Sequence, residues 1–413
     1  MVFAFATAAI TYRTSTRIYT PSEPEHESWG LIDFRDAVYY PVVAMLDGEN
    51  PYDPALYRET YPVGQVFPLY SPATLLIHLP FGLLSPELAP WAYYAFSVVL
   101  TVLLAYLALR FTRPQPAAAA TFLLAALIIV SRPGHWNLIV GQYVATMTVG
   151  VYVALLFARD RPWLAGLGIA LSTIKPTFGG PLVVLMLARG DVRAVAIGLA
   201  IAACAGALGA LPPIVAAGGM MEFAEIIPIN QAAFGDDTFT NPLLSPVRVD
   251  LAVLAARLVG TPLPTIAGAA FSLAILVAGA SAIWRIRDDE TDPRPISAAV
   301  ACLTIVACTY HLAYDLVVLT APAVMLAVGS PRDVFGARPV LRFSLLGAAL
   351  LLAGNYLASQ NAVERLSLTG SVWLIVTSAN AVAVLTLLTG YIVAALWRPF
   401  VTSSQHGQFS STE

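Results

Sequence analysis

The stretch "WAYYAFSVVLTVLLAYLALR" at residues 91–110 decides the fold class, because it carries no charge until the closing Arg110. A helix of about 20 apolar residues crosses the hydrocarbon core of a bilayer, which is about 30 Å thick. Similar runs recur near 117–131, 142–158, 194–213, 263–284, 295–311, 312–329, 342–358 and 372–396. Together with a shorter apolar start at 1–12, they predict an all-α integral membrane protein, a multi-helix bundle of about 12 membrane segments.

The overall composition indicates the same class of protein. The 413 residues are 58% hydrophobic and 11% charged, and the mean hydropathy is +0.74. A water-soluble globule cannot bury so much apolar surface. The net charge of −3 provides no basic field for a nucleic acid, so that class of partner is excluded. The cysteines lie in apolar segments at spacings that match no metal motif, and no cofactor is expected.

The arginines between the apolar runs indicate which connections face the cytoplasm. Arg110 and Arg113 follow the first run, and further arginines recur in alternate short connections, at 159–161, 189–193, 285–287, 332–342 and 398. By the positive-inside rule these connections are cytoplasmic, and so is the tail 400–413. Three polar stretches are then left for the outside, 13–90, 134–142 and 214–262. We therefore expect one multi-pass domain, 1–413, in the plasma membrane, with its large loops outside.

Two apolar segments are broken by proline. A crossing at 67–86 would place Arg110 outside, so this segment is expected to be an interfacial or re-entrant helix in the first outer loop. The segment 163–188 is split by Lys175-Pro176 into legs of about 12 residues, roughly 18 Å each, which predicts a short hairpin with Lys175 at its tip. A lysine at membrane depth needs an anion, and a lipid phosphate is one candidate. An internal salt bridge and snorkelling to the interface are the alternatives.

The most carboxylate-rich stretch is "WGLIDFRDAVYYPVVAMLDGENPYDPALY" at 29–57, in the first outer loop. The apolar residues of 34–46 fall on one helical face, which predicts an amphipathic helix at the outer membrane surface. Asp33 would be its N-cap and Asp36 the N3 residue of a start similar to a capping box. A carboxylate placed there is also a candidate general base, able to take the proton from an attacking hydroxyl. The two roles are compatible.

Several short motifs occur in order along most of the chain, namely "DFRDAVYY", "MLDGENPYD", "FPLYSP", "GQY" at 141–143, "KPTFGG" at 175–180 and "YHLAYDLVVLTAP" at 310–322. In order and placement they resemble glycosyltransferase family 87, polyprenol-phosphate-mannose-dependent mannosyltransferases of the GT-C class. The resemblance implies a multi-helix fold with its active site facing outside. It also implies a catalytic aspartate in the first outer loop, which maps best to Asp33. The family usually spaces this residue and the next tyrosine more tightly than Asp33 and Tyr39, so Asp36 stays an alternative.

The resemblance further implies the inverting transfer of a hexose, mannose in this family, from a polyprenyl or dolichyl phosphate to a lipid or glycan acceptor. A phosphate leaves readily, so the reaction requires no divalent metal. The site needs a base for the acceptor hydroxyl and donors for the phosphate. Besides Lys175, the candidates for binding substrate are His311, Tyr314, Asp315, Arg132, His135, Gln142 and Tyr70, with Trp29 and Trp136 able to stack on a sugar ring.

These candidates have structural alternatives. His311 and Asp315 are one helical turn apart and could simply bond each other. Polar residues such as Arg132 are ordinary in outer loops, and the aromatic residues could belong to an interfacial belt. Two other classes of function also stay open. A transporter or lipid flippase would show paired repeats, whereas one Lys-Pro break is found here, and a membrane scaffold would have little need for the carboxylates.

The arginine pattern makes the orientation testable. In intact cells, an impermeant thiol reagent should label a cysteine introduced at Glu25, in the outer stretch, but not one at Ser404, in the cytoplasmic tail. Permeabilised cells, in which both positions should react, are the control. If only Ser404→Cys were labelled in intact cells, the orientation would be the opposite of the one predicted.

Overall fold

The computed structural model describes residues 1–18, 29–235, 239–288, 294–328 and 338–396. Every regular element within these ranges is helical, and β-pairing there is limited to two single-residue bridges, Ile18 with Gly30 and Arg248 with Leu312. The all-α class predicted from the sequence is therefore confirmed. Glu25, Ser404 and the tail 400–413 lie outside the described residues.

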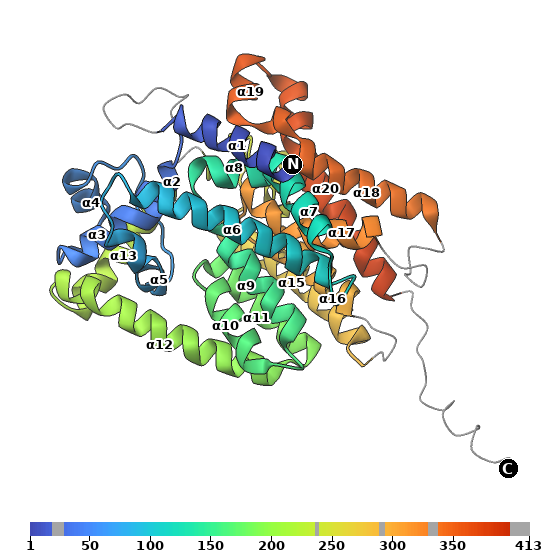
Figure 1. Ribbon diagram of the computed structural model, residues 1–413, viewed down its shortest axis with the longest axis horizontal. Helices are drawn as coiled ribbons and strands as arrows, with labels where there is room; N and C mark the ends of the chain where they lie inside the picture. The colour runs from blue at the N-terminus through green and yellow to red at the C-terminus, as the bar shows by residue number, and fades with distance from the viewer. Residues whose placement is uncertain (19–28, 236–238, 289–293, 329–337, 397–413) are drawn as a thin grey trace, which may run out of the picture.

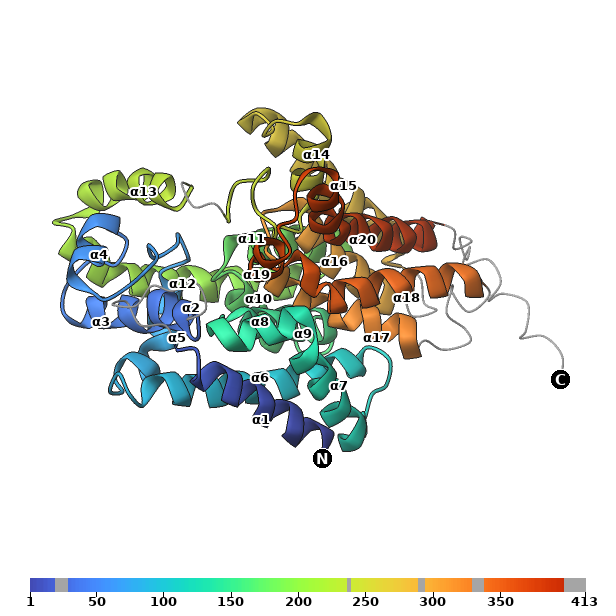
Figure 2. The same ribbon diagram turned by 90° about the horizontal axis from the view of Figure 1, so that it is seen from above.

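The first outer stretch contains short helices. With the helix that precedes them, they are α1 (Val2–Ser15), α2 (Ile32–Phe34), the π-helix η1 (Arg35–Tyr39), α3 (Tyr40–Leu46), α4 (Pro54–Thr60) and α5 (Ala73–Gly82). Figures 1 and 2 show α3, α4 and α5 gathered at one end of the molecule. α5 has 10 residues, too few to cross a membrane, which agrees with the interfacial or re-entrant helix predicted for this segment.

The rest of the chain packs into a bundle. Its first half contains α6 (Ala89–Arg110), α7 (Ala118–Val130), α8 (Arg132–Val140), α9 (Val144–Phe157), α10 (Pro162–Ser172), α11 (Pro176–Arg189), α12 (Val192–Ala216) and α13 (Met220–Gly235). Its second half contains α14 (Leu251–Val259), α15 (Thr265–Ile286), α16 (Arg294–Cys308), the 3₁₀ helix η2 (Ala313–Leu319), α17 (Thr320–Val328), α18 (Pro339–Gly354), the 3₁₀ helix η3 (Tyr356–Ala358), α19 (Gln360–Arg365) and α20 (Gly370–Leu396).

Four helices in the described ranges are long and apolar enough to cross a membrane alone, namely α6, α12, α15 and α20. The pair α7 and α8, bent by 75° at its break, makes a fifth span if the two helices are counted as one. Other apolar helices, such as α9 and α18, have 10–17 residues. The total of about 12 membrane segments therefore stays a prediction.

The two halves of the predicted hairpin are α10 and α11, and Lys175 lies between them at the tip. The hairpin predicted for 163–188 is thus present. In Figure 1, α6 and α12 run antiparallel along the long axis; α6 begins and α12 ends near α3, α5 and α13. The arginine-bearing end of α6 points the opposite way, as the arginine pattern requires if the end with α3 and α5 faces outside.

Three local predictions were wrong. The 134–142 connection is helical, because Ser131 caps α8 by accepting the Gly134 N–H at 3.2 Å and Gly141 ends it in the left-handed region at φ 74°. The acidic helix begins at Ile32 after Leu31, so Asp33 is not its N-cap and no side chain caps this start. The run 312–329 is divided into η2 and α17 rather than forming one span.

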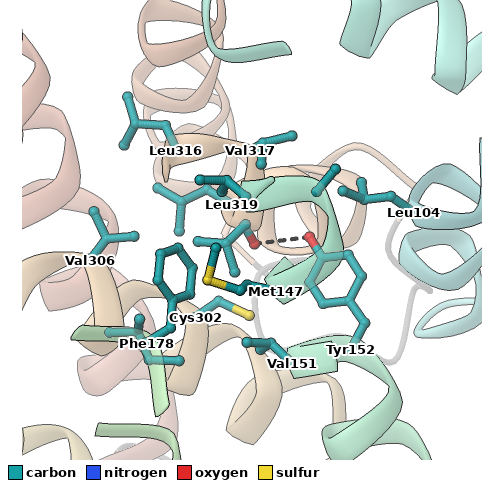
Figure 3. Close-up of a cluster of buried hydrophobic side chains, with 14 of the residues drawn as sticks. Leu104, Met147, Val151, Tyr152, Phe178, Cys302, Val306, Leu316, Val317 and Leu319 are labelled. Atoms are coloured by element: carbon teal, nitrogen blue, oxygen red, sulfur yellow. Dashed lines mark hydrogen bonds between the residues drawn. The ribbon is translucent and has the colours of Figure 1, made fainter. Parts of the chain in front are cut away.

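A buried apolar cluster joins α6, α9, α11, α16 and η2 (Figure 3). Phe178 and Met147 are fully buried in it, and Cys302 packs there as a small core residue. The Tyr152 hydroxyl donates a hydrogen bond to the Val318 carbonyl at 2.9 Å and accepts one from the Ala321 N–H at 2.9 Å. This hydroxyl satisfies backbone groups where η2 passes into α17.

Two glycines set the close approach of α9 and α10. A Cβ built on Gly150 would lie 2.6 Å from the Gly168 carbonyl oxygen, and a Cβ on Gly168 would lie 2.4 Å from the Gly150 carbonyl oxygen. Neither oxygen belongs to a side chain that could rotate away. These two positions therefore require glycine because the backbones touch.

The contact between α9 and α10 predicts opposite effects for two glycine substitutions. Gly150→Ala should lower the thermal stability of the purified protein in detergent, by about 1–3 kcal/mol, because the added methyl overpacks the crossing. Gly180→Ala in α11 is the control, because a Cβ there meets nothing within 4 Å. It should be neutral or stabilise by about 0.5–1 kcal/mol. Equal melting temperatures for the two variants would contradict the close approach.

Candidate active site

A cavity of about 400 Å³ opens between the first outer stretch, α8, the hairpin tip and α13. Its volume is within the range of about 300–1,000 Å³ that is typical of small-molecule sites. Polar groups converge on it from six parts of the chain, and they belong to Asp33, Gln65, Tyr70, Gln142, Lys175, Thr177, Gln231, Thr240, Tyr310 and Tyr314. Trp29, Trp136, Phe234 and Phe239 supply aromatic surface.

Asp33 reaches this cavity because α2 is fixed against the end of α8. Leu31 adopts the left-handed region at φ 58°, and its N–H donates to the Ile139 carbonyl at 2.7 Å. Gly141 makes the contact possible, since a Cβ there would lie 2.6 Å from the Phe34 Cβ. The strained Leu31 conformation and the glycine together place the half-buried Asp33 carboxylate in the cavity wall.

Asp36 points elsewhere. Its Oδ2 accepts the N–H groups of Gly64 and Gln65 at 3.0 and 2.9 Å, and the residue is 1% exposed. Burial raises the pKa of the Asp36 carboxyl to about 7, although the two N–H donors act in the opposite direction. The side chain is not part of the cavity lining. Its contacts hold the segment at Gln65 in position, and Gln65 itself does line the cavity.

Lys175 is paired with a carboxylate of the protein. Its Nζ lies 2.8 Å from Asp315 Oδ1 and 2.9 Å from Asp315 Oδ2, with both side chains buried. The predicted need for a buried anion is met by Asp315, which is the internal salt bridge that the sequence left open. Lys175 nevertheless contributes to the cavity wall, between the rings of Phe178 and Tyr314.

Asp315 accepts hydrogen bonds from two further donors. His311 Nδ1 lies 2.9 Å from Asp315 Oδ2, and the Leu312 N–H donates to the same oxygen at 3.0 Å. The contact of His311 with Asp315 was among the alternatives predicted, but His311 precedes η2 and is not on a helix. His311 Nε2 lies 3.1 Å from Thr309 Oγ1. Neither His311 nor Asp315 lines the cavity, so both support Lys175 and Tyr314 from behind.

Tyr70 and Gln142 also line the cavity. The loop that carries Tyr70 is held to the hairpin tip, because the Ser71 N–H donates to the Ile174 carbonyl at 2.9 Å. Gln142 follows directly on the glycine that ends α8 and is 5% exposed. Burial raises the pKa of the Tyr70 hydroxyl above its ordinary value, and the nearby Asp33 charge raises it further. Tyr70 is therefore a neutral hydroxyl beside the carboxylate.

The structure separates two predicted residues from the others. Arg132 and His135, at the start of α8, line a second, smaller cleft of about 150 Å³ rather than the cavity. Other lining residues were not predicted from the sequence, among them Gln65, Thr177, Gln231, Thr240 and Tyr310. Thr177 lies in the motif at 175–180 and Tyr310 in the motif at 310–322, close to Lys175 and His311. These two residues could therefore have been predicted from the motifs. Gln231 and Thr240 carried no such signal.

An all-helical bundle with helices long and apolar enough to span a membrane, and with a cavity lined by polar and aromatic side chains, defines an integral membrane protein with a candidate small-molecule site. The family model for glycosyltransferase family 87 matches residues 68–310, more than half of the sequence, and the chain belongs to that family. It is therefore a glycosyltransferase, and the resemblance seen in the sequence is confirmed. Searches of curated proteins and of solved structures found no match.

The matched region contains part of the cavity. Tyr70, Gln142 and Lys175 lie within 68–310. Asp33 precedes this region and Asp315 follows it. The family match therefore covers part of the cavity lining and assigns no role to Asp33.

The buried ion pair predicts a loss of stability when one partner is removed. Lys175→Met leaves the Asp315 carboxylate without its ammonium partner, which should lower the free energy of unfolding by about 3–5 kcal/mol. Adding Asp315→Asn should recover part of this loss, because no unpaired charge is then buried. Thermal unfolding in detergent measures both, with the exposed Arg193→Met as the control. Wild-type stability of the single Lys175→Met variant would show that the pair is not needed.

Proposed function

We propose that this glycosyltransferase moves a hexose from a polyprenyl or dolichyl phosphate to a hydroxyl of a lipid or glycan acceptor, with Asp33 as general base. The observation that carries the proposal is the placement of the Asp33 carboxylate in the wall of a cavity that also contains Tyr70, Gln142 and Lys175. Family membership supplies the reaction class, and the cavity supplies a site for the reacting groups.

The reaction is a single displacement at the anomeric carbon. The acceptor hydroxyl gives its proton to the Asp33 carboxylate as its oxygen attacks the sugar from the face opposite the phosphate. The bond from the anomeric carbon to the phosphate oxygen breaks, and the polyprenyl phosphate leaves with the electron pair. One displacement inverts the configuration. The free enzyme regains its carboxylate when the proton passes to solvent.

The lining fits a sugar bound above such a base. Trp136 and Trp29 offer apolar faces for a pyranose ring, and Gln142, Gln65 and Tyr70 offer donors and acceptors for its hydroxyls. Lys175 is held by two oxygens of Asp315, so its role here is to keep the hairpin tip and Tyr314 in place rather than to carry free charge. Mannose is the hexose we favour, on the family resemblance alone.

We place the reaction at the outer face of the plasma membrane. The support is the arginine pattern of the connections together with the gathering of α3, α4, α5 and α13 at the end where α6 begins (Figures 1 and 2). A donor that is anchored by a long apolar chain remains in the bilayer there. The acceptor is then a lipid or a glycan that is accessible from outside.

Asp33→Asn tests the base. The change keeps the size of the side chain and removes its basicity, so it should lower the transfer rate by about 10²–10⁴-fold while the protein still folds. Membranes incubated with labelled polyprenyl-phosphate hexoses and extracted envelope lipids provide the measurement. Asp36→Asn is the matched control and should lose much less, because Asp36 does not reach the cavity.

Two outcomes would refute this assignment. If Asp36→Asn loses the larger share of activity, Asp36 is the base and its contact with Gly64 and Gln65 is part of the mechanism. If both variants transfer sugar at near-normal rates, the base is neither residue and the first outer stretch has a structural role.

A further inference from the structure

A second cleft lies directly beside the cavity. Its volume is about 150 Å³, and it shares part of its wall with the cavity, namely Trp29, Trp136, Val140 and Phe239. The far wall comes from α1, from the start of α8 and from the segment 356–361. In Figure 1, α1 runs beside α8, and the two helices are in contact. The cleft and the cavity are therefore neighbouring compartments of one site.

The lining of this cleft is strongly cationic. Arg13, Arg17 and Arg132 all contribute to it, with His135 between them. None of the described residues that line it is an aspartate or a glutamate. Its other polar groups come from Tyr356, Ser359, Gln360 and Asn361. Like charges repel each other, and none of the described lining residues supplies an anion to offset this, which makes the cleft a candidate site for a negatively charged ligand.

Arg132 is the buried member of this group. It is 6% exposed, and its Nε has no hydrogen-bond partner among the described residues. His135 Nε2 is also buried without a partner there. The guanidinium lies 4.4 Å from the centroid of the Trp136 ring. Burying a guanidinium is costly unless its donors are paired, and among the described residues the Arg132 Nε has no acceptor. Arg132 therefore has a buried N–H donor available for a ligand.

An apolar groove lies on the other side of the bend between α7 and α8. It has a volume of about 220 Å³ and runs between α7, α17 and α18, and its lining includes Ser131 and Pro133, the neighbours of Arg132 in the chain. Leu127 and Leu350 line it and are 54% and 64% exposed. The bend between α7 and α8 thus separates the cationic cleft from an apolar groove that opens to the outside of the bundle.

We propose that the cleft formed by Arg13, Arg17 and Arg132 binds the phosphate of a lipid substrate, with the apolar chain of that lipid in the groove between α7 and α18. A phosphate fits because several arginines can each present paired N–H donors to its oxygens. A long apolar chain fits because the groove is lined by leucines and alanines and by Ser131 and Pro133, the chain neighbours of Arg132. The identification of this lipid as a substrate rests on the proposed function. The binding site itself does not.

Binding can be measured without any transfer reaction. Purified protein in detergent is titrated with undecaprenyl phosphate, undecaprenol and inorganic phosphate, and the tryptophan fluorescence is followed, because Trp136 stacks on Arg132. Arg132→Gln should weaken undecaprenyl phosphate binding by about 10- to 100-fold, as expected when a charge-assisted hydrogen bond is lost. If Arg132→Gln does not fold, Arg17→Gln, at a half-buried position, provides the same test and should also weaken binding. The exposed Arg113→Gln is the control and should bind as the wild type does.

The groove is tested separately. Ala353→Trp fills it and should weaken binding of undecaprenyl phosphate while binding of inorganic phosphate is unchanged. Undecaprenol should bind at least tenfold more weakly than undecaprenyl phosphate to the wild type. Equal binding of undecaprenyl phosphate to Arg132→Gln, Arg17→Gln and Arg113→Gln would overturn the phosphate site. An unchanged affinity in Ala353→Trp would overturn the path of the chain.

Kinetics then identify the lipid. In Arg132→Gln, a raised apparent KM for the labelled polyprenyl-phosphate hexose alone assigns the cleft to the donor, and a raised KM for the acceptor lipid alone assigns it to the acceptor. If binding is lost as expected and neither KM changes, the lipid is not a substrate and that part of the proposal fails. If the wild type binds undecaprenyl phosphate but transfers no sugar, the site stands and the proposed function fails.

Discussion

The buried ion pair between Lys175 and Asp315 joins segments that are far apart in the sequence. Lys175 lies at the tip of the α10–α11 hairpin, and Asp315 lies at the start of η2. The next residue toward the N-terminus, Tyr314, accepts a hydrogen bond at its carbonyl from Asn137 of α8 at 2.9 Å. Ser71 binds the same hairpin tip from the first outer stretch. The pair therefore ties together segments that contribute to the cavity walls.

Burying the pair costs desolvation free energy, and contacts with neighbouring groups offset part of that cost. Removing two charges from water costs several kcal/mol per ion, so the attraction alone is a weak source of stability. The hydrogen bonds from His311 Nδ1 and the Leu312 N–H offset part of the desolvation cost of Asp315. The contacts of the ammonium group with the rings of Phe178 and Tyr314 offset part of the cost of Lys175. We regard the arrangement as a means of fixing geometry. It also neutralises Lys175, so the charge of Asp33 in the cavity is not cancelled by this lysine.

The sequence predicted those features that depend on local pattern. Apolar runs identified the helical class, and Lys175-Pro176 identified the hairpin, because proline ends a helix and the flanking arginines limit its reach. Asp33 could be selected as a carboxylate in the right loop. The position of its side chain could not be predicted, because it depends on Leu31 in the left-handed region and on Gly141, which is distant in the sequence. The capping prediction failed for the same reason, because Leu31 precedes the helix, bound through its N–H to the Ile139 carbonyl of α8, and Asp33 falls inside the helix.

The α8 helix explains why residues that look alike in sequence end in different compartments. Arg132 and Gln142 both flank the 134–142 connection, and as loop residues they would be expected to converge. A helix of nine residues instead holds its ends about 13 Å apart at 1.5 Å per residue. Arg132 therefore lines the cationic cleft, and Gln142 lines the cavity. Trp136, which lies between them in the chain, lines both. Because the two compartments share the wall formed by Trp29, Trp136, Val140 and Phe239, an anion bound beside Arg132, as we propose, would neighbour a group that lies in the cavity.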